Sequence, residues 1–155
     1  LLGRQPFWIA DPVFLIVIIV AALATVLAVR VVRPHEQGLQ LADAAGLALF
    51  SISGAQIAET AGHPGLIVVV MATITGVFGG VLRDVLCAEI PMILRRGNIY
   101  ATAVVAGTTL YVLLQGMGME RETAAVCGMF SIAGLRIAAI YFKLSLPVFD
   151  YRDKN

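Results

Sequence analysis

The hydrophobic positions of the chain gather into five long runs, which are separated by short segments rich in charge, proline and glycine. These runs occupy residues 13–32, 39–61, 65–82, 97–119 and 123–142. A helix of about 20 residues is about 30 Å long, which matches the hydrocarbon thickness of a bilayer. The pattern therefore predicts an all-α protein, a polytopic bundle of five transmembrane helices joined by short loops.

The second run is less apolar than the others because it contains Asp43, Ser51, Ser53 and Gln56. A polar spanning helix of this kind is expected to face protein or water rather than lipid. Ser53 and Gln56 share one helical face and are candidates to line a polar seam. Asp43 is a further pore-lining candidate, although an acidic residue near a helix N-terminus also suits the helix dipole.

The charges between the runs predict how the helices are oriented. Of the 11 Lys and Arg residues, eight fall on one side of a five-helix arrangement and two on the other, with Arg136 inside the last run. The eight are Arg30, Arg33, Arg83, Arg95, Arg96, Lys143, Arg152 and Lys154, and the two are Arg4 and Arg121. Since positively charged loops are retained in the cytoplasm, we expect a multi-pass membrane protein with a cytoplasmic C-terminus.

Two segments of the chain resemble each other and point to an internal repeat. Residues 1–9 and 85–93 each contain an aliphatic pair, a short polar stretch, a proline and an apolar patch before a long helix. Those helices are three spans apart and cross in opposite directions, as the halves of an inverted repeat do. We expect residues 1–38 to end a first repeat, residues 39–119 to form a second, and residues 120–155 to form a final helix and tail. The start without Met fits a parent with about seven spans, of which five are present here.

The third run contains three glycines, Gly76, Gly79 and Gly80, in its second half. Each costs about 1 kcal/mol of helix propensity relative to Ala, and together they permit a kink or break. Unwound backbone is tolerated in a membrane where protein or a water-filled cavity satisfies it, so the glycines indicate a path for a solute or ion. The alternative is close packing, because Gly76 and Gly80 form a GxxxG pair, and the glycines alone favour this alternative.

Charged and polar neighbours of these glycines shift the balance toward a pore. Arg83 and Asp84 follow directly and can turn toward an aqueous vestibule, although an Arg at a helix end snorkels to the headgroups by default. Thr73 and Thr75 precede the glycines and are possible pore-lining residues. Arg136 lies deep in the last run, where we expect it to pair with a carboxylate or carbonyls inside the bundle or to mark a subunit contact.

Composition supports a membrane protein and narrows its chemistry. Hydrophobic residues make up 59% of the 155 residues and charged residues 14%, against about 25% charged residues in soluble domains. A net charge of +1 without a long basic run argues against nucleic-acid binding. The sequence contains no motif for a catalytic nucleophile, a dinucleotide or a metal, so we expect no enzymatic activity, no metal and no cofactor.

The motifs around the glycines resemble those of a known family. GVFGGVLRDVLCAEIPMILRR at 76–96 is followed by IYATAVVAGTTLYVLL at 99–114, and LLGRQPFWIADP and DAAGLALFSISGAQIA precede them. Together they are similar to the prokaryotic trimeric intracellular cation (TRIC) channels, a group also labelled a glycine transporter domain or a UPF0126-type membrane family. The resemblance extends over nearly the whole chain.

The resemblance implies seven helices in two inverted three-helix repeats plus a final helix, and a homotrimer in the lipid bilayer with a pore in each protomer. It places this chain at the third to seventh helices and puts Gly76, Gly79 and Gly80 in the glycine-kinked fifth helix, with Arg83 and Asp84 beyond.

The implied function is passive conduction of a monovalent cation such as K⁺ across a bacterial or archaeal inner membrane. Small side chains and broken-helix carbonyls would form the hydrated path, and the charged pair after the glycines would tune its electrostatics and gating. Two alternatives stay open. One is a secondary transporter for a small solute such as glycine, and the other is a membrane protein whose glycines only pack.

Overall fold

The computed structural model describes residues 13–31, 36–94, 99–142 and 144, and the regular structure in these residues is helical. The elements are α2 (Val13–Val31), α3 (Glu36–Thr60), α4 (Gly65–Leu86), the short 3-10 turn η1 (Met92–Leu94), α5 (Ala101–Gly116) and α6 (Arg121–Tyr141). Each predicted apolar run contains a helix, which confirms an all-α transmembrane bundle. By length and composition, Gly38–Thr60, Gly65–Leu86 and Arg121–Tyr141 are able to cross a membrane.

The chain divides into two units, of which the first is Leu1–Leu39. It contains α2, whose described hydrophobic side chains, Val17, Ile18 and Val20 among them, are exposed. A helix that is apolar all round is typical of a membrane span. Residues 1–9, which the repeat comparison uses, lie outside the described residues. So do most of the charges that predict the orientation, namely Arg4, Arg33, Arg95, Arg96, Lys143, Arg152 and Lys154.

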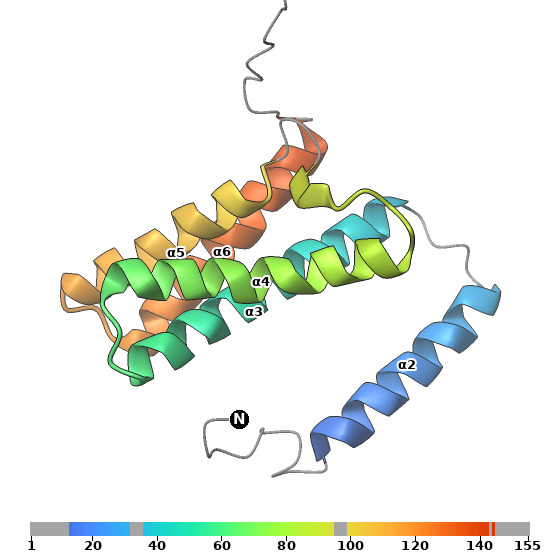
Figure 1. Ribbon diagram of the computed structural model, residues 1–155, viewed down its shortest axis with the longest axis horizontal. Helices are drawn as coiled ribbons and strands as arrows, with labels where there is room; N and C mark the ends of the chain where they lie inside the picture. The colour runs from blue at the N-terminus through green and yellow to red at the C-terminus, as the bar shows by residue number, and fades with distance from the viewer. Residues whose placement is uncertain (1–12, 32–35, 95–98, 143, 145–155) are drawn as a thin grey trace, which may run out of the picture. The chain divides into compact units, whose positions relative to one another are not determined.

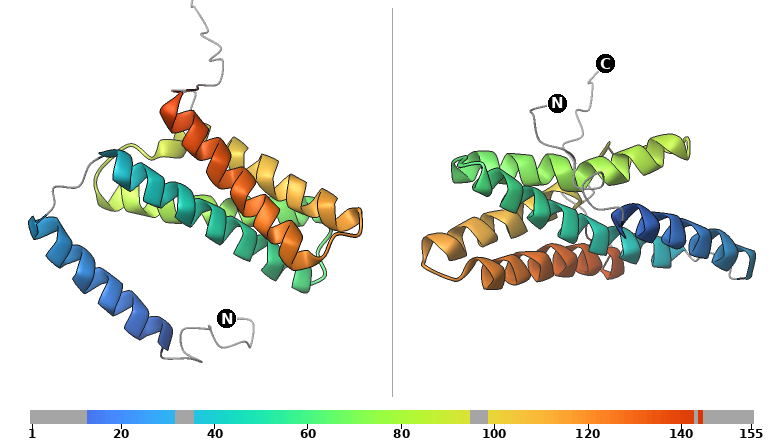
Figure 2. Two further views of the ribbon diagram at one scale, coloured as in Figure 1. Left: turned by 180° about the vertical axis from the view of Figure 1, so that it is seen from behind. Right: turned by 90° about the horizontal axis from the view of Figure 1, so that it is seen from below.

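The second unit, Gln40–Asn155, holds most of α3 together with α4, α5 and α6 (Figure 1 and Figure 2). The helices α3 and α4 form one antiparallel hairpin and α5 and α6 form another, and the two tight turns lie at the same end of the bundle. The turn η1 lies at the opposite end, which we call the η1 end. Helix α5 packs along both α4 and α6.

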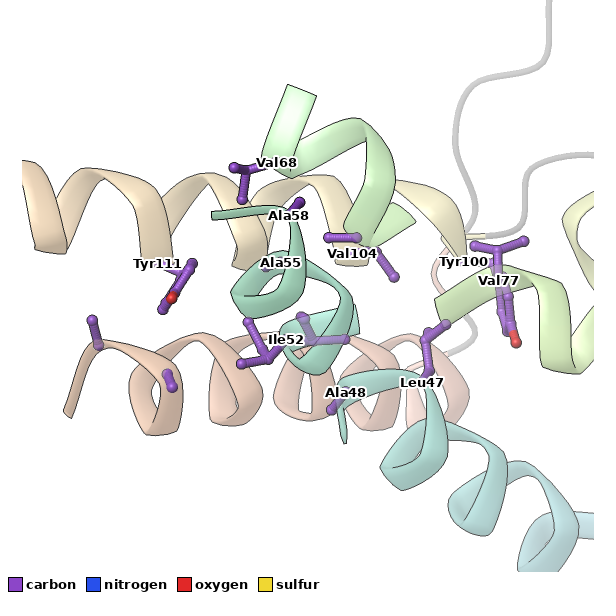
Figure 3. Packing of buried hydrophobic residues seen from close by; sticks show 14 residues of the cluster. Leu47, Ala48, Ile52, Ala55, Ala58, Val68, Val77, Tyr100, Val104 and Tyr111 are labelled. Carbon is purple, nitrogen blue, oxygen red and sulfur yellow. The ribbon is translucent and has the colours of Figure 1, made fainter. Parts of the chain in front are cut away.

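Small side chains let these helices approach closely. The buried cluster drawn in Figure 3 includes Leu47, Ala48, Ile52, Ala55, Ala58, Val68, Val77, Tyr100, Val104 and Tyr111. Glycine marks a crossing point of α5 and α6, because a Cβ on Gly107 would collide with the side chain of Ile132. Close contact between small residues is a main source of helix association in a membrane, where no hydrophobic effect drives helices together.

Helix α4 is continuous from Gly65 to Leu86. The break that the sequence analysis allowed at the three glycines is therefore absent, and the expectation of broken-helix carbonyls is wrong. The helix also continues past residue 82, its expected end, so Arg83 and Asp84 lie within its last turns rather than beyond it. Helix α5 is shorter than the expected run 97–119, of which residues 97 and 98 lie outside the described part of the chain.

Candidate functional site

Four charged side chains from three helices meet at the η1 end of the bundle. They are Asp43 in α3, Arg83 and Asp84 in the last turns of α4, and Arg136 in the second half of α6. We call these four residues the charge cluster, and Tyr100, directly before α5, lies against it. Two acids and two bases leave the cluster without net charge, as expected of ionised groups inside a membrane protein, which are almost always paired.

Arg83 bridges two buried carboxylates. Its Nη1 donates to Asp43 Oδ1 at 2.6 Å, and its Nε and Nη2 both donate to Asp84 Oδ1, at 2.9 and 2.7 Å. The side chains of Asp43 and Asp84 are 7% and 5% exposed, whereas that of Arg83 is 26% exposed. Hydrogen bonds between ionised groups are about twice as strong as neutral ones, so Arg83 firmly links α4 to α3. It is also the most accessible member of the charge cluster.

Asp84 fixes the chain that follows α4. Its Oδ2 accepts the backbone N–H of Met92 at 2.8 Å, and its backbone carbonyl accepts the N–H of Glu89 at 2.8 Å. Ala88 has a positive φ of 56°, a conformation uncommon for residues other than glycine, at this reversal of the chain. From their position after the glycines, Arg83 and Asp84 were expected to act as one functional pair. The structure gives them different contacts, because Asp84 also holds the connection to η1.

Arg136 is the most deeply buried base of the charge cluster, with a side chain 3% exposed. Its Nη1 donates to the carbonyl of Ile99 at 3.1 Å, and its Nη2 lies 3.8 Å from Met92 Sδ and 4.0 Å from Asp43 Oδ2. The guanidinium carbon stands 4.7 Å from the centre of the Tyr100 ring, which is a cation–π arrangement. Arg136 therefore lies against a carbonyl, a carboxylate and an aromatic face inside the bundle.

A hollow of about 170 Å³ opens beside the charge cluster. It is lined by Asp43, Gly46, Leu47, Phe50, Gly76, Gly79, Gly80 and Tyr100, which come from α3, from α4 and from the position directly before α5. One water molecule needs about 10–15 Å³ of such space, so the hollow has room for several. Its walls are mostly apolar, with a carboxylate and a tyrosine as polar groups, which is the composition expected of a small binding site.

The three glycines of α4 have different surroundings. A Cβ on Gly76 would collide with Ser51 Oγ, and a Cβ on Gly80 would collide with the hydroxyl of Tyr100. A Cβ on Gly79 would meet no heavy atom within 4 Å among the described residues. Close packing therefore accounts for Gly76 and Gly80, whereas Gly79 borders the open space of the hollow.

The other pore-lining candidates are not among the residues that line the hollow. The hydroxyls of Thr73 and Thr75 each donate to the carbonyl four residues earlier in α4, at 2.8 Å. Ser53 is exposed and Gln56 is half-buried. They follow Asp43 by 10 and 13 positions, which is about 15 and 20 Å along a helix. The structure thus brings Asp43 to the three glycines and leaves these four residues farther along the helices.

Several residues of the hollow were not singled out from the sequence. Gly46 and Phe50 follow Asp43 at the i+3 and i+7 positions of one helical face, so helical spacing was a signal that could have found them. Tyr100 had no comparable signal, because it is 57 positions from Asp43. Its hydroxyl nevertheless lies 3.4 Å from Asp43 Oδ1.

A second polar group joins α3, α5 and α6 at the end with the two tight turns. The hydroxyl of Tyr111 donates to Glu59 Oε2 at 2.6 Å, and Arg121 Nε lies 3.1 Å from the same oxygen. Arg121 also donates to the carbonyl of Gln56 at 2.8 Å and to Thr60 Oγ1 at 2.9 Å. These residues lie outside the lining of the hollow and fasten three helices together.

Known proteins match nearly the whole chain. A family model described as "Glycine transporter" matches residues 40–116, which include the complete lining of the hollow but not Arg136. The UPF0126 membrane protein of Vibrio cholerae is 41% identical over 152 residues, or 96% of this chain and 62% of that protein. The UPF0126 inner membrane protein YadS of Escherichia coli K12 is 42% identical over 151 residues, or 96% of this chain and 72% of that protein. The chain thus spans less than two thirds of the Vibrio protein.

Two solved structures are similar to this fold. The TRIC trimeric intracellular cation channel orthologue from Rhodobacter sphaeroides matches with a TM-score of 0.83 and 35% identity, over 92% of this chain and 73% of that one. A second structure is described as the structural basis for conductance through TRIC cation channels. It matches with a TM-score of 0.74 and 34% identity, over 86% of this chain and 65% of that one.

Proposed function

Because this chain belongs to the UPF0126 family of membrane proteins and its structural neighbours are TRIC cation channels, we propose that it is part of a channel that conducts K⁺ passively across a prokaryotic inner membrane. The observation that carries the proposal is the hollow beside Gly79, with the carboxylate of Asp43 at its edge. Small residues leave room for water, and an acid favours a cation there. Membrane-protein relatives and channel neighbours also favour a role other than catalysis.

We propose that the side chain of Arg83 moves when the channel opens. Its Nη1 donates a hydrogen bond to Asp43 Oδ1, and it is the most exposed member of the charge cluster. A cation that reaches Asp43 has to share or replace this contact. One charge moved through the full membrane field is worth about 2.3 kcal/mol per 100 mV, so displacement of Arg83 would make opening depend on voltage.

The assembly of the whole protein is also part of the proposal, since the chain spans 62% and 72% of the two relatives. We propose a homotrimer in the lipid bilayer with a pore in each protomer, between the repeat formed by residues 39–119 and a preceding inverted repeat. The neighbour described as trimeric supports the trimer. The charge asymmetry of the loops supports a cytoplasmic C-terminus.

The test is single-channel recording from the full-length natural protein, reconstituted in planar bilayers with symmetrical KCl. We expect discrete unitary currents, and in a KCl gradient we expect reversal toward the K⁺ equilibrium potential. Gly79→Leu places a side chain in the hollow and should reduce the unitary current strongly while the trimer persists in size-exclusion chromatography. Gly134→Leu is the matched control, because Gly134 is a helical glycine in α6 with nothing within 4 Å among the described residues. Unchanged current in Gly79→Leu would remove the hollow from the path.

A second candidate function is secondary transport of a small zwitterion such as glycine. The adjacent carboxylate of Asp43 and guanidinium of Arg83 offer complementary charges to an amine and a carboxylate, and charged side chains inside a membrane protein mark substrate sites in transporters. Liposomes distinguish the two candidates. Saturable glycine uptake that depends on an ion gradient, without unitary currents, would favour transport and overturn the channel.

A further inference from the structure

We propose that Arg136 is a fixed counter-charge, a positioning residue that sets how strongly Asp43 attracts the permeating cation. The proposal rests on the proposed channel function and extends it to the final helix. Arg136 lies in α6, outside the residues 40–116 that the family model matches, and outside the lining of the hollow. It contacts the lining at Asp43 and at the ring of Tyr100, and Asp43 is the charged one of these two residues.

The two arginines of the charge cluster approach opposite oxygens of one carboxylate. Arg83 Nη1 lies 2.6 Å from Asp43 Oδ1, and Arg136 Nη2 lies 4.0 Å from Asp43 Oδ2. Among the described residues, Oδ2 is buried and accepts no hydrogen bond, and the Arg136 guanidinium is its ionic partner. The carboxylate is thus held between a hydrogen-bonded base and a base in ionic contact.

The surroundings of the two bases decide which of them a cation can displace. Arg136 is 3% exposed and is held by the carbonyl of Ile99, the sulfur of Met92 and the ring of Tyr100. Arg83 is 26% exposed, and its contacts within the cluster are to carboxylates. A cation arriving through the hollow can therefore replace Arg83 at Oδ1, whereas Arg136 stays in place behind the carboxylate.

Electrostatics gives Arg136 a measurable effect on that cation. With Arg136 present, the negative charge of Asp43 is partly cancelled even after Arg83 has moved away. Without it, the two carboxylates of the cluster face a single base, and the site carries a net negative charge. A charge 4.0 Å from the other oxygen of the same carboxylate is a strong interaction at the effective dielectric of a partly buried site. Its loss should hold the cation more tightly and for longer.

A purely structural role makes a different prediction. Arg136 also contacts Met92 and Ile99, so its loss could act through these two residues alone. Lysine keeps the charge but lacks the planar fork of donors that makes these several contacts. A structural role therefore predicts that Arg136→Lys and Arg136→Gln are equally damaging. The counter-charge role predicts that Arg136→Lys stays close to wild type in cation affinity.

The experiment measures cation affinity in two ways on the full-length trimer. Unitary conductance is recorded against K⁺ concentration to obtain the half-saturating value. Separately, the melting temperature in detergent is followed as K⁺ replaces N-methyl-glucamine at constant ionic strength, a readout that needs no current. We expect Arg136→Gln to lower the half-maximal K⁺ concentration by about tenfold in both measurements, and Arg136→Lys to leave it near wild type.

The outcomes separate this inference from the channel proposal. Wild-type protein without unitary currents would refute the channel, whatever the melting midpoints show. A K⁺ midpoint of melting that Arg136→Gln leaves unchanged, or that Arg136→Lys shifts equally, would refute the counter-charge. If Arg136→Gln does not assemble, Asp43→Asn is added to it, since removing both charges again leaves the buried cluster without net charge, with Arg83 paired to Asp84. Recovery of the trimer supports the pairing, and failure to recover it counts against the inference.

Discussion

Alanine at Gly79 and alanine at Gly80 should change the stability of the protein in opposite directions. Each replacement gains about 1 kcal/mol of helix propensity. At Gly79 no heavy atom among the described residues lies within 4 Å of the new Cβ, so Gly79→Ala should stabilise the protein by up to about 1 kcal/mol. At Gly80 the new Cβ collides with the hydroxyl of Tyr100. Tyr100 is only 2% exposed and packs in the core, so its ring can yield only by disturbing that packing.

Overpacking of a core costs about 1–3 kcal/mol, which exceeds or cancels the propensity gain. Gly80→Ala should therefore destabilise the protein by about 0–2 kcal/mol, and the two variants should differ by about 1–3 kcal/mol. The measurement is unfolding of the full-length trimer in detergent, followed by circular dichroism during denaturation. Tyr100→Phe completes the test, because it removes the atom that collides.

The double-mutant cycle gives the refuting result. In the Tyr100→Phe background, Gly80→Ala should lose most of its cost, because residues in contact couple whereas independent sites add. Equal stability of Gly79→Ala and Gly80→Ala would contradict the packing assigned to Gly80. A cost of Gly80→Ala that Tyr100→Phe leaves unchanged would contradict the assigned contact.

Three further predictions test how the polar groups divide their roles. Asp84→Asn should destabilise the trimer by about 1–3 kcal/mol in the same unfolding assay, because it weakens a buried charge-assisted contact, while the reversal potential in a KCl gradient stays at the wild-type value. Asp43→Asn should move that reversal potential toward zero, since the carboxylate at the hollow is lost, and an unmoved potential would exclude Asp43 from cation selection. Tyr111→Phe should cost about 1.5–3 kcal/mol of stability through the lost hydrogen bond to Glu59 and leave unitary conductance unchanged, so altered conductance at normal stability would contradict a fastening role.

The helices were predictable because bilayer thickness sets the length of an apolar run. Their ends were less so, as α4 illustrates. The expected end of this helix is residue 82, because the uncharged run stops there and a charged pair follows. The helix continues because Arg83 and Asp84 find partners inside the bundle, at Asp43 and at the backbone of Met92. The cost of placing these charges in a membrane is offset by residues distant in sequence, and a local run of residues gives no sign of such partners.

The candidate site was predictable where it is local in the sequence. Gly79 and Arg83 were chosen because they adjoin one another in α4, and polarity marked Asp43. Polarity alone also selected Thr73 and Thr75, whose hydroxyls bond to the backbone of their own helix and so require no cavity. Contacts at large sequence separation carry no such local mark. Asp43 and Arg83 are 40 residues apart, so the contact between them could be found only from the fold.

The continuity of α4 changes how its glycines can serve an ion path. Three glycines weaken a helix by about 3 kcal/mol in total, whereas each backbone group freed in a membrane and left unsatisfied costs several kcal/mol. The intact helix is therefore favoured unless water or protein groups are in place to hydrogen-bond the freed backbone groups. Gly79 then contributes space rather than carbonyl ligands, and the polarity of the path has to come from side chains beside that space. Asp43 and Tyr100 are the polar side chains of that lining, so the volume at Gly79 and the charge at Asp43 are separable requirements of one path.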